Sequence, residues 1–71
     1  MSAPDLKEVR LSQQDTERFR SDPEFTKELV YKAYCFADLH GHGWKVVASD
    51  GAHLFDMHVN GDAFDPQGKQ I

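Results

Sequence analysis

The sequence predicts an α+β fold in which one short and one long N-terminal helix pack on a C-terminal antiparallel β-meander of two to three strands. The first observation is a change of period: apolar residues recur three and four positions apart in residues 23–40 but alternate with polar residues after Gly43. The second is a pair of turn signals, Asp50-Gly51 and Asn60-Gly61, which favour short hairpin loops. A helical layer and a sheet layer each have one apolar side, so we expect them to bury those sides against each other.

The length and composition predict one small soluble domain spanning residues 1–71, with 1–5 and 67–71 flexible. The net charge of -4 is spread evenly and no basic cluster occurs, which disfavours nucleic-acid binding. A single cysteine, Cys35, excludes an internal disulfide, and no apolar run is long enough to cross a membrane. We therefore expect a cytoplasmic protein without a cofactor.

The N-terminal segment "LKEVRL" alternates apolar and charged residues, which predicts a short strand or an extended arm. Such a strand would add to one edge of the sheet, and the sequence leaves open which edge. Ser12 is a good helix N-cap, and Asp15 three residues later resembles a capping box. This predicts a short first helix in "SQQDTERFR".

The long helix is predicted from Pro23 to His40. Asp22 can cap it, proline suits the first helical position, and Gly41 can adopt the left-handed conformation that closes many helices. Its apolar stripe predicts the residues that face the sheet, namely Phe25, Leu29, Ala33, Phe36 and Ala37.

The first hairpin is predicted with a two-residue turn at Asp50-Gly51. This register sets Val46 opposite Phe55. It also pairs Val47 with Leu54, Lys45 with Asp56 as an ion pair, and Trp44 with Met57.

The second hairpin is predicted to turn at Asn60-Gly61, which sets Met57 opposite Phe64. Phe64 would then extend the core face onto a short third strand, and Pro66 would end that strand.

A second stripe on the long helix is the main candidate binding surface. Tyr31, Tyr34, Cys35 and Asp38 are spaced so that they lie opposite the core stripe. Either the first helix or the N-terminal arm covers this stripe, or it is exposed and binds a protein partner, since tyrosine is enriched at binding hot spots. The outer face of the first hairpin is a second candidate, with Leu54, Val47, Asp56 and His58.

These features predict a non-enzymatic protein-interaction module: an inhibitor, an adaptor or an accessory subunit whose partner is another protein, with a homodimer as one option. No catalytic constellation is apparent, because Cys35 faces away from the apolar stripe and a chain this small has little room for a pocket. The predicted partner-binding residues are Tyr31, Tyr34, Cys35, Asp38, Leu54, Asp56 and His58.

Two other functions remain open. His40, His42 and His58 could form a zinc site, since the hairpin register brings His58 towards His42, although zinc sites normally use three or four converging ligands. The stretch "VRLSQQDTERF" resembles the strand and first helix of ribbon-helix-helix proteins, which implies a dimeric DNA-binding protein. Pro23 and the hairpins after the second helix depart from that pattern, so we rank this alternative last.

Overall fold

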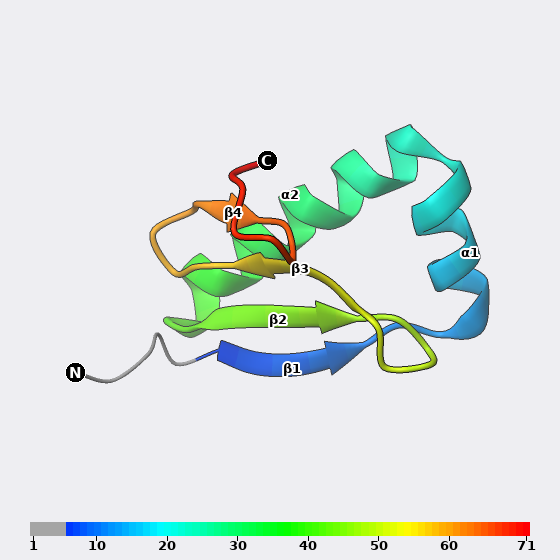
Figure 1. The fold of residues 1–71 in the computed structure, drawn as a ribbon. Coiled ribbons are helices and arrows are strands. Elements are labelled where there is room, and N and C mark those ends of the chain that lie inside the picture. The colour runs from blue at the N-terminus through cyan, green and yellow to red at the C-terminus, as the bar shows by residue number, and fades with distance from the viewer. Residues whose placement is uncertain (1–5) are drawn as a thin grey trace.

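The computed structural model describes residues 6–71, so the predicted flexibility of residues 1–5 lies outside the described residues. Within this range the chain forms two helices and a four-stranded mixed sheet, and the predicted α+β fold is confirmed. Figure 1 shows the sheet with the two helices packed against it. The elements are β1 (Leu6–Arg10), α1 (Gln13–Ser21), α2 (Pro23–His40), β2 (Gly43–Val47), β3 (His53–Met57) and β4 (Ala63–Phe64).

The strands lie in the order β1-β2-β3-β4, so the N-terminal strand joins the sheet beside β2. The pair β1–β2 is parallel, because the two helices carry the chain back to the starting end of the sheet before β2 begins. The pairs β2–β3 and β3–β4 are antiparallel, as expected for strands joined by tight turns. Both outer strands, β1 and β4, are therefore edge strands.

The helix ends agree with the predicted caps. The Ser12 hydroxyl accepts a hydrogen bond from the Asp15 amide at 3.1 Å. The Asp22 carboxylate accepts from the Glu24 amide at 3.1 Å, which satisfies a free donor of the first turn of α2. At the other end Gly41 has a φ of 73° and donates its amide to the Ala37 carbonyl at 2.9 Å.

The first hairpin has a three-residue loop instead of the predicted two-residue turn. The Gly51 amide donates to the Ala48 carbonyl at 2.9 Å, and the Ala48 amide donates to Ala52 at 2.8 Å. This longer loop places Val47 opposite His53, so the predicted pairing of Val47 with Leu54 is wrong.

A bulge then cancels the effect of the longer loop. The register shifts between Val46 and Val47, so that Leu54 is the extra residue on β3. Beyond the bulge, Val46 lies opposite Phe55, and Trp44 opposite Met57, as predicted. The core face of this hairpin is therefore the expected one.

The second hairpin has the same loop length but no compensating bulge. The His58 amide donates to the Asp62 carbonyl at 2.9 Å, and Met57 lies opposite Ala63 instead of Phe64. The prediction that Phe64 faces the core is wrong, because a shift of one residue turns a strand side chain to the other face. Ala63 is buried in its place.

The C-terminal segment turns back on β4 through a third loop of the same kind. The Gly68 amide donates to the Asp65 carbonyl at 2.9 Å, and Gln70 forms an isolated bridge with Phe64. Residues 67–71, predicted to be a flexible tail, thus lie beside the last strand.

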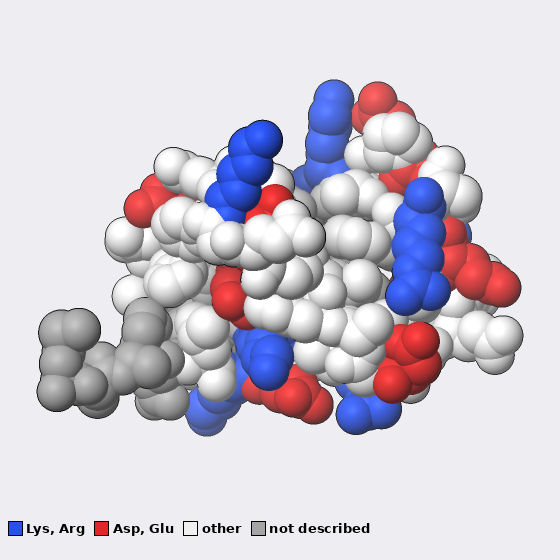
Figure 2. Space-filling view, in the orientation of Figure 1, with Lys and Arg blue, Asp and Glu red and all other residues white. Residues whose placement is uncertain are grey.

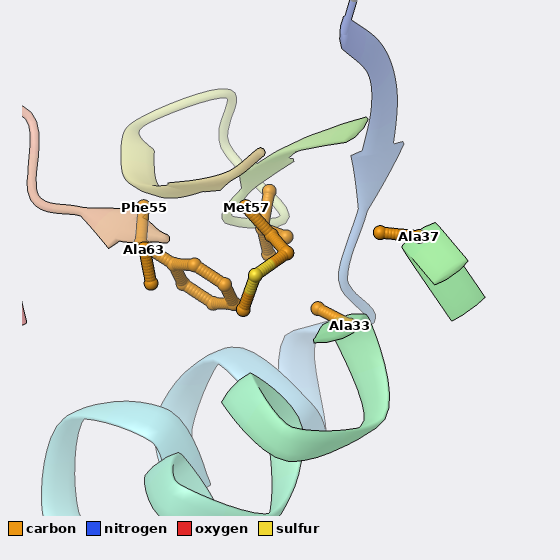
Figure 3. Packing of buried hydrophobic residues seen from close by; sticks show 6 residues of the cluster. Ala33, Ala37, Phe55, Met57 and Ala63 are labelled. Atoms are coloured by element: carbon orange, nitrogen blue, oxygen red, sulfur yellow. The ribbon is translucent and has the colours of Figure 1, made fainter. Parts of the chain in front are cut away.

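The sheet supplies the large side chains of the core and α2 supplies small ones. Phe55, Met57 and Val46 are the largest fully buried side chains, whereas the only buried residues of α2 are Ala33 and Ala37 (Figure 3). Phe36 was predicted to lie in the core, but it is 49% exposed. The two alanines are the buried contacts of α2, Leu29 and Val30 pack on the core while only partly buried, and Phe36 lies at the flank of the helix.

Helix α1 contacts α2 through a hydrogen bond from the Thr26 hydroxyl to the Phe19 carbonyl at 2.8 Å, and it contacts β3 and the β2–β3 loop through one aromatic contact and one polar contact. The rings of Phe19 and Phe55 stack with their centroids 5.9 Å apart. The buried Thr16 hydroxyl donates to the Ser12 carbonyl at 2.8 Å and accepts from the Ser49 amide at 2.9 Å. This hydroxyl therefore joins the first turn of α1 to the β2–β3 loop.

Candidate partner-binding surfaces

The tyrosines of the second stripe are exposed. Tyr31 is 67% and Tyr34 is 47% exposed, and their ring centroids lie 6.4 Å apart. Cys35 and Asp38 are exposed as well. Within residues 6–71, neither α1 nor β1 covers this stripe, so the interpretation in which these elements bury it is wrong.

The tyrosines border an apolar groove between α2 and the β4 edge of the sheet, which we call the tyrosine groove. Its volume is about 470 Å³. Buried residues of β3 and β4 form part of its lining, and the last residue of the chain contributes to it. The residues that define it are Val30, Tyr31, Tyr34, Met57, Ala63 and Ile71.

The loop between β3 and β4 positions Tyr34. Gly61 has a φ of 97°, a conformation that residues other than glycine rarely adopt. A Cβ atom at this position would lie 2.7 Å from Cε1 of Tyr34, so the ring packs directly against the loop backbone. The signal Asn60-Gly61, identified as a turn, thus also fixes one wall of the tyrosine groove.

Cys35 affects the chemistry of Tyr31, which precedes it by about one helical turn. A hydrogen bond with the Cys35 side chain, followed by the charge of that side chain, raises the pKa of the Tyr31 phenol above its ordinary value. A phenol with its ordinary pKa near 10 is already neutral near pH 7, so Tyr31 can donate a hydrogen bond to a partner with or without this shift.

The outer face of the first hairpin does not form the predicted apolar patch. Leu54 packs against the core cluster, and Val47 is buried. The Asp56 carboxylate accepts from His53 Nε2 at 2.8 Å, and this contact replaces the predicted ion pair with Lys45. The bulge accounts for Leu54, which is the extra residue on β3. Lys45 and Asp56 still lie opposite each other, but the Asp56 carboxylate pairs with His53.

His58, the remaining residue of that predicted patch, packs against Phe64 with ring centroids 5.0 Å apart. The acidic and basic side chains on the face seen in Figure 2 are interspersed and not separated by sign.

The histidines at the helix end are only partly brought together. His42 and His58 line one pocket beside Gly43, as the register predicted. His42 Nδ1 lies 3.0 Å from the Gly43 carbonyl oxygen, and the His40 ring packs on Phe36 with a centroid distance of 6.0 Å. Among residues 6–71, no three His, Cys, Asp or Glu side chains are grouped so that they could hold a metal ion.

A second apolar groove lies on the other side of α2, towards β1, and we call it the Trp44 groove. Its volume is about 360 Å³. The indole Nε1 of Trp44 is buried and has no hydrogen-bond partner in the part of the chain that the structure describes. The residues that define the groove are Val9, Leu29, Lys32, Phe36, His40, Trp44 and Val46.

The sequence did not predict the Trp44 groove, because Phe36 was expected to face the sheet. The relative widths of the two layers explain why the groove forms. Four strands spaced about 4.8 Å apart make a sheet roughly 19 Å wide, whereas one helix is about 10 Å across. One long helix on a four-stranded sheet therefore leaves an apolar flank on each side.

The helices of residues 6–71 are all too short or too polar to cross a membrane. Together, the two grooves and the exposed tyrosines are the strongest candidate binding features of the described chain. No protein-family model, curated protein or solved structure shows a significant match to this sequence.

Proposed function

We propose that this chain is a small non-enzymatic protein-interaction module, acting as an inhibitor, adaptor or accessory subunit, and that it binds a protein partner at the tyrosine groove. One observation carries the proposal: Tyr31 and Tyr34 are exposed side by side at the rim of an apolar groove of about 470 Å³. Tyrosines that combine a large apolar ring with a polar hydroxyl are enriched at binding hot spots.

The chemistry of the groove fits an apolar anchor residue of the partner. Met57 and Ala63 offer an apolar lining, and the tyrosine hydroxyls offer hydrogen bonds at the edge. Lys27 lines the groove, and the exposed Asp38 follows Tyr34 by about one helical turn, so both signs of charge are present on this part of α2 for a polar rim. The single cysteine, Cys35, suits a reducing compartment, so we assign the module to the cytoplasm.

The test compares the wild-type chain with the double variant Tyr31→Ala/Tyr34→Ala. Each is immobilised and exposed to lysate of the native host, and the captured proteins are quantified by mass spectrometry. The best-enriched protein is then purified, and its affinity for each variant is measured by calorimetry. We expect the double variant to weaken binding about a hundredfold, since two hot-spot residues are removed.

Leu39→Ala is the matched control, because Leu39 is 74% exposed on the same helix and does not line either groove. This control should bind as the wild type does. Equal binding by the double variant would overturn the proposed site. Unfolding of the double variant, detected by circular dichroism, would assign the tyrosines to the core and overturn it as well.

A further inference from the structure

Strand β1 has a free edge. It pairs with β2 on one side, and within residues 6–71 no strand pairs with its other side. The Leu11 amide donates to the Val47 carbonyl at 2.9 Å, so the backbone groups of residues 7, 9 and 11 face β2. Because these groups alternate in direction along a strand, those of Glu8 and Arg10 face outwards and are available to another strand.

The side chains of β1 also divide into two sets. Val9 lies next to Val46 in the sheet, on the helix side, and forms part of the Trp44 groove. Glu8 and Arg10 lie on the opposite side, with side chains 54% and 57% exposed, and their charged groups approach to 3.9 Å. The strand thus presents one apolar residue between two residues of opposite charge.

This pattern is complementary to itself in only one register. Two copies related by a twofold axis, with their β1 strands antiparallel and their helices on the same side, can pair about residue 7, 8, 9 or 10. Centring on Lys7, Glu8 or Arg10 sets like charges opposite each other, which is destabilising. Centring on Val9 sets Val9 against Val9 and places each Glu8 opposite Arg10 of the second copy.

The directions of the backbone groups fit the Val9-centred register. Glu8 and Arg10 of opposite copies form the hydrogen-bonded pairs, because their amides and carbonyls face outwards. Val9 then forms the non-hydrogen-bonded pair, in which side chains approach most closely. Since Val9 lies at the Trp44 groove, this contact joins the apolar grooves of the two copies.

We propose that a second copy of this chain pairs with β1 in the antiparallel Val9-centred register, forming one continuous sheet across a twofold axis. This proposal concerns a surface on the opposite side of α2 from the tyrosine groove and goes beyond the proposed function. The recognition is self-complementary: apolar at Val9, and ionic between Glu8 of each copy and Arg10 of the other.

Charge reversal at Glu8 and Arg10 tests the register. Sedimentation equilibrium from micromolar to millimolar concentration should show a monomer-dimer equilibrium for the wild type. Glu8→Arg and Arg10→Glu should each raise the dimer dissociation constant about tenfold or more, because two attractive pairs become repulsive. An equimolar mixture of the two single variants should form a heterodimer about as stable as the wild-type dimer, and the double variant should recover the homodimer.

The control is Glu28→Arg, which makes the same charge change at an exposed position of α2 and should leave dimerisation unchanged. A wild type that stays monomeric throughout, single variants that dimerise normally, or a mixture that fails to associate would each overturn the proposal. A variant that is merely unfolded cannot regain association on mixing. Tyr31→Ala/Tyr34→Ala should dimerise normally, so this proposal and the proposed function can fail independently.

Discussion

The two sides of α2 differ in the size of the side chains that they carry. The side that faces the sheet contributes the small residues Ala33 and Ala37, whereas the flanks contribute Tyr31, Tyr34 and Phe36. Both alanines belong to the same buried cluster as Phe55 and Met57, and Figure 3 shows Ala33 pointing toward the Met57 side chain. Helix α2 therefore closes the core with its smallest apolar residues and lines the two grooves with its largest ones.

The first prediction compares how much a core side chain and a flank side chain contribute to the free energy of unfolding. Phe55→Ala should lower the free energy of unfolding by about 3–5 kcal/mol, because it removes a fully buried ring and the stacking contact of Phe19. Phe36→Ala should cost less than about 1 kcal/mol, since that ring is half exposed. Urea denaturation followed by circular dichroism measures both, and equal costs would show that Phe36 belongs to the core.

The second prediction tests why the helix uses alanine at the contact. Ala37→Leu should destabilise the chain by about 1–3 kcal/mol, because Ala37 is completely buried and the extra carbon atoms must push the helix from the sheet. Asp38→Leu, at the next and exposed position, should change stability by less than about 0.5 kcal/mol. A stabilising Ala37→Leu in thermal melts would mean that the layers are not tightly packed.

The third prediction concerns α1, which is held by a polar contact as well as an apolar one. Thr16→Val keeps the shape but removes the hydroxyl, so that the Ser49 amide loses its acceptor. We expect a loss of about 1–2 kcal/mol. Thr16→Ser keeps the hydroxyl and should cost less, and equal melting temperatures for the two variants would contradict the role of the hydrogen bond.

The smallest effect is expected on the exposed flank itself. The Cys35 side chain raises the pKa of Tyr31, so Cys35→Ala should lower the pKa of Tyr31 towards its ordinary value near 10. Tyrosinate absorbance in a Tyr34→Phe background follows Tyr31 alone. Cys35→Ser keeps a hydrogen-bonding group but removes the side-chain charge, so it distinguishes the two causes of the shift. An unchanged Tyr31 titration in Cys35→Ala would contradict the contact between Cys35 and Tyr31.

The sign of the accompanying pH effect follows from the same shift. A raised pKa means that the folded chain keeps the Tyr31 proton where the unfolded chain has begun to lose it. This contribution to stability is complete below the ordinary tyrosine pKa and is lost as the pH rises through the raised value. The slope of stability against pH in the alkaline range should therefore be less negative in Cys35→Ala.

The two hairpins show how far local sequence predicts a fold. Both turns contain a glycine after a residue suited to turns, which predicts the hairpin but not the loop length. In the first hairpin, the bulge at Leu54 restores the predicted pairing of Val46 with Phe55. In the second, no bulge follows, and Ala63 takes the place expected for Phe64. Loop length and bulges depend on packing against the rest of the sheet, which local patterns do not contain.

The candidate site was predicted to a similar extent. Helical spacing placed Tyr31, Tyr34 and Cys35 on one stripe, and they do lie together. Spacing could not say whether the stripe is covered, because the position of β1 depends on pairing with a strand far along the chain. The Trp44 groove was not predicted either. Apolar periodicity shows which side of a helix is apolar, but it does not show how much of that side is buried.

The parallel pairing of β1 with β2 also has a consequence for how the chain folds. Leu6 lies beside Gly43, whereas the three tight loops join neighbours only a few residues apart. Contacts between distant residues carry a larger loop-closure entropy and form late. We therefore expect the meander to assemble from local contacts and β1 to be the last strand that joins the sheet.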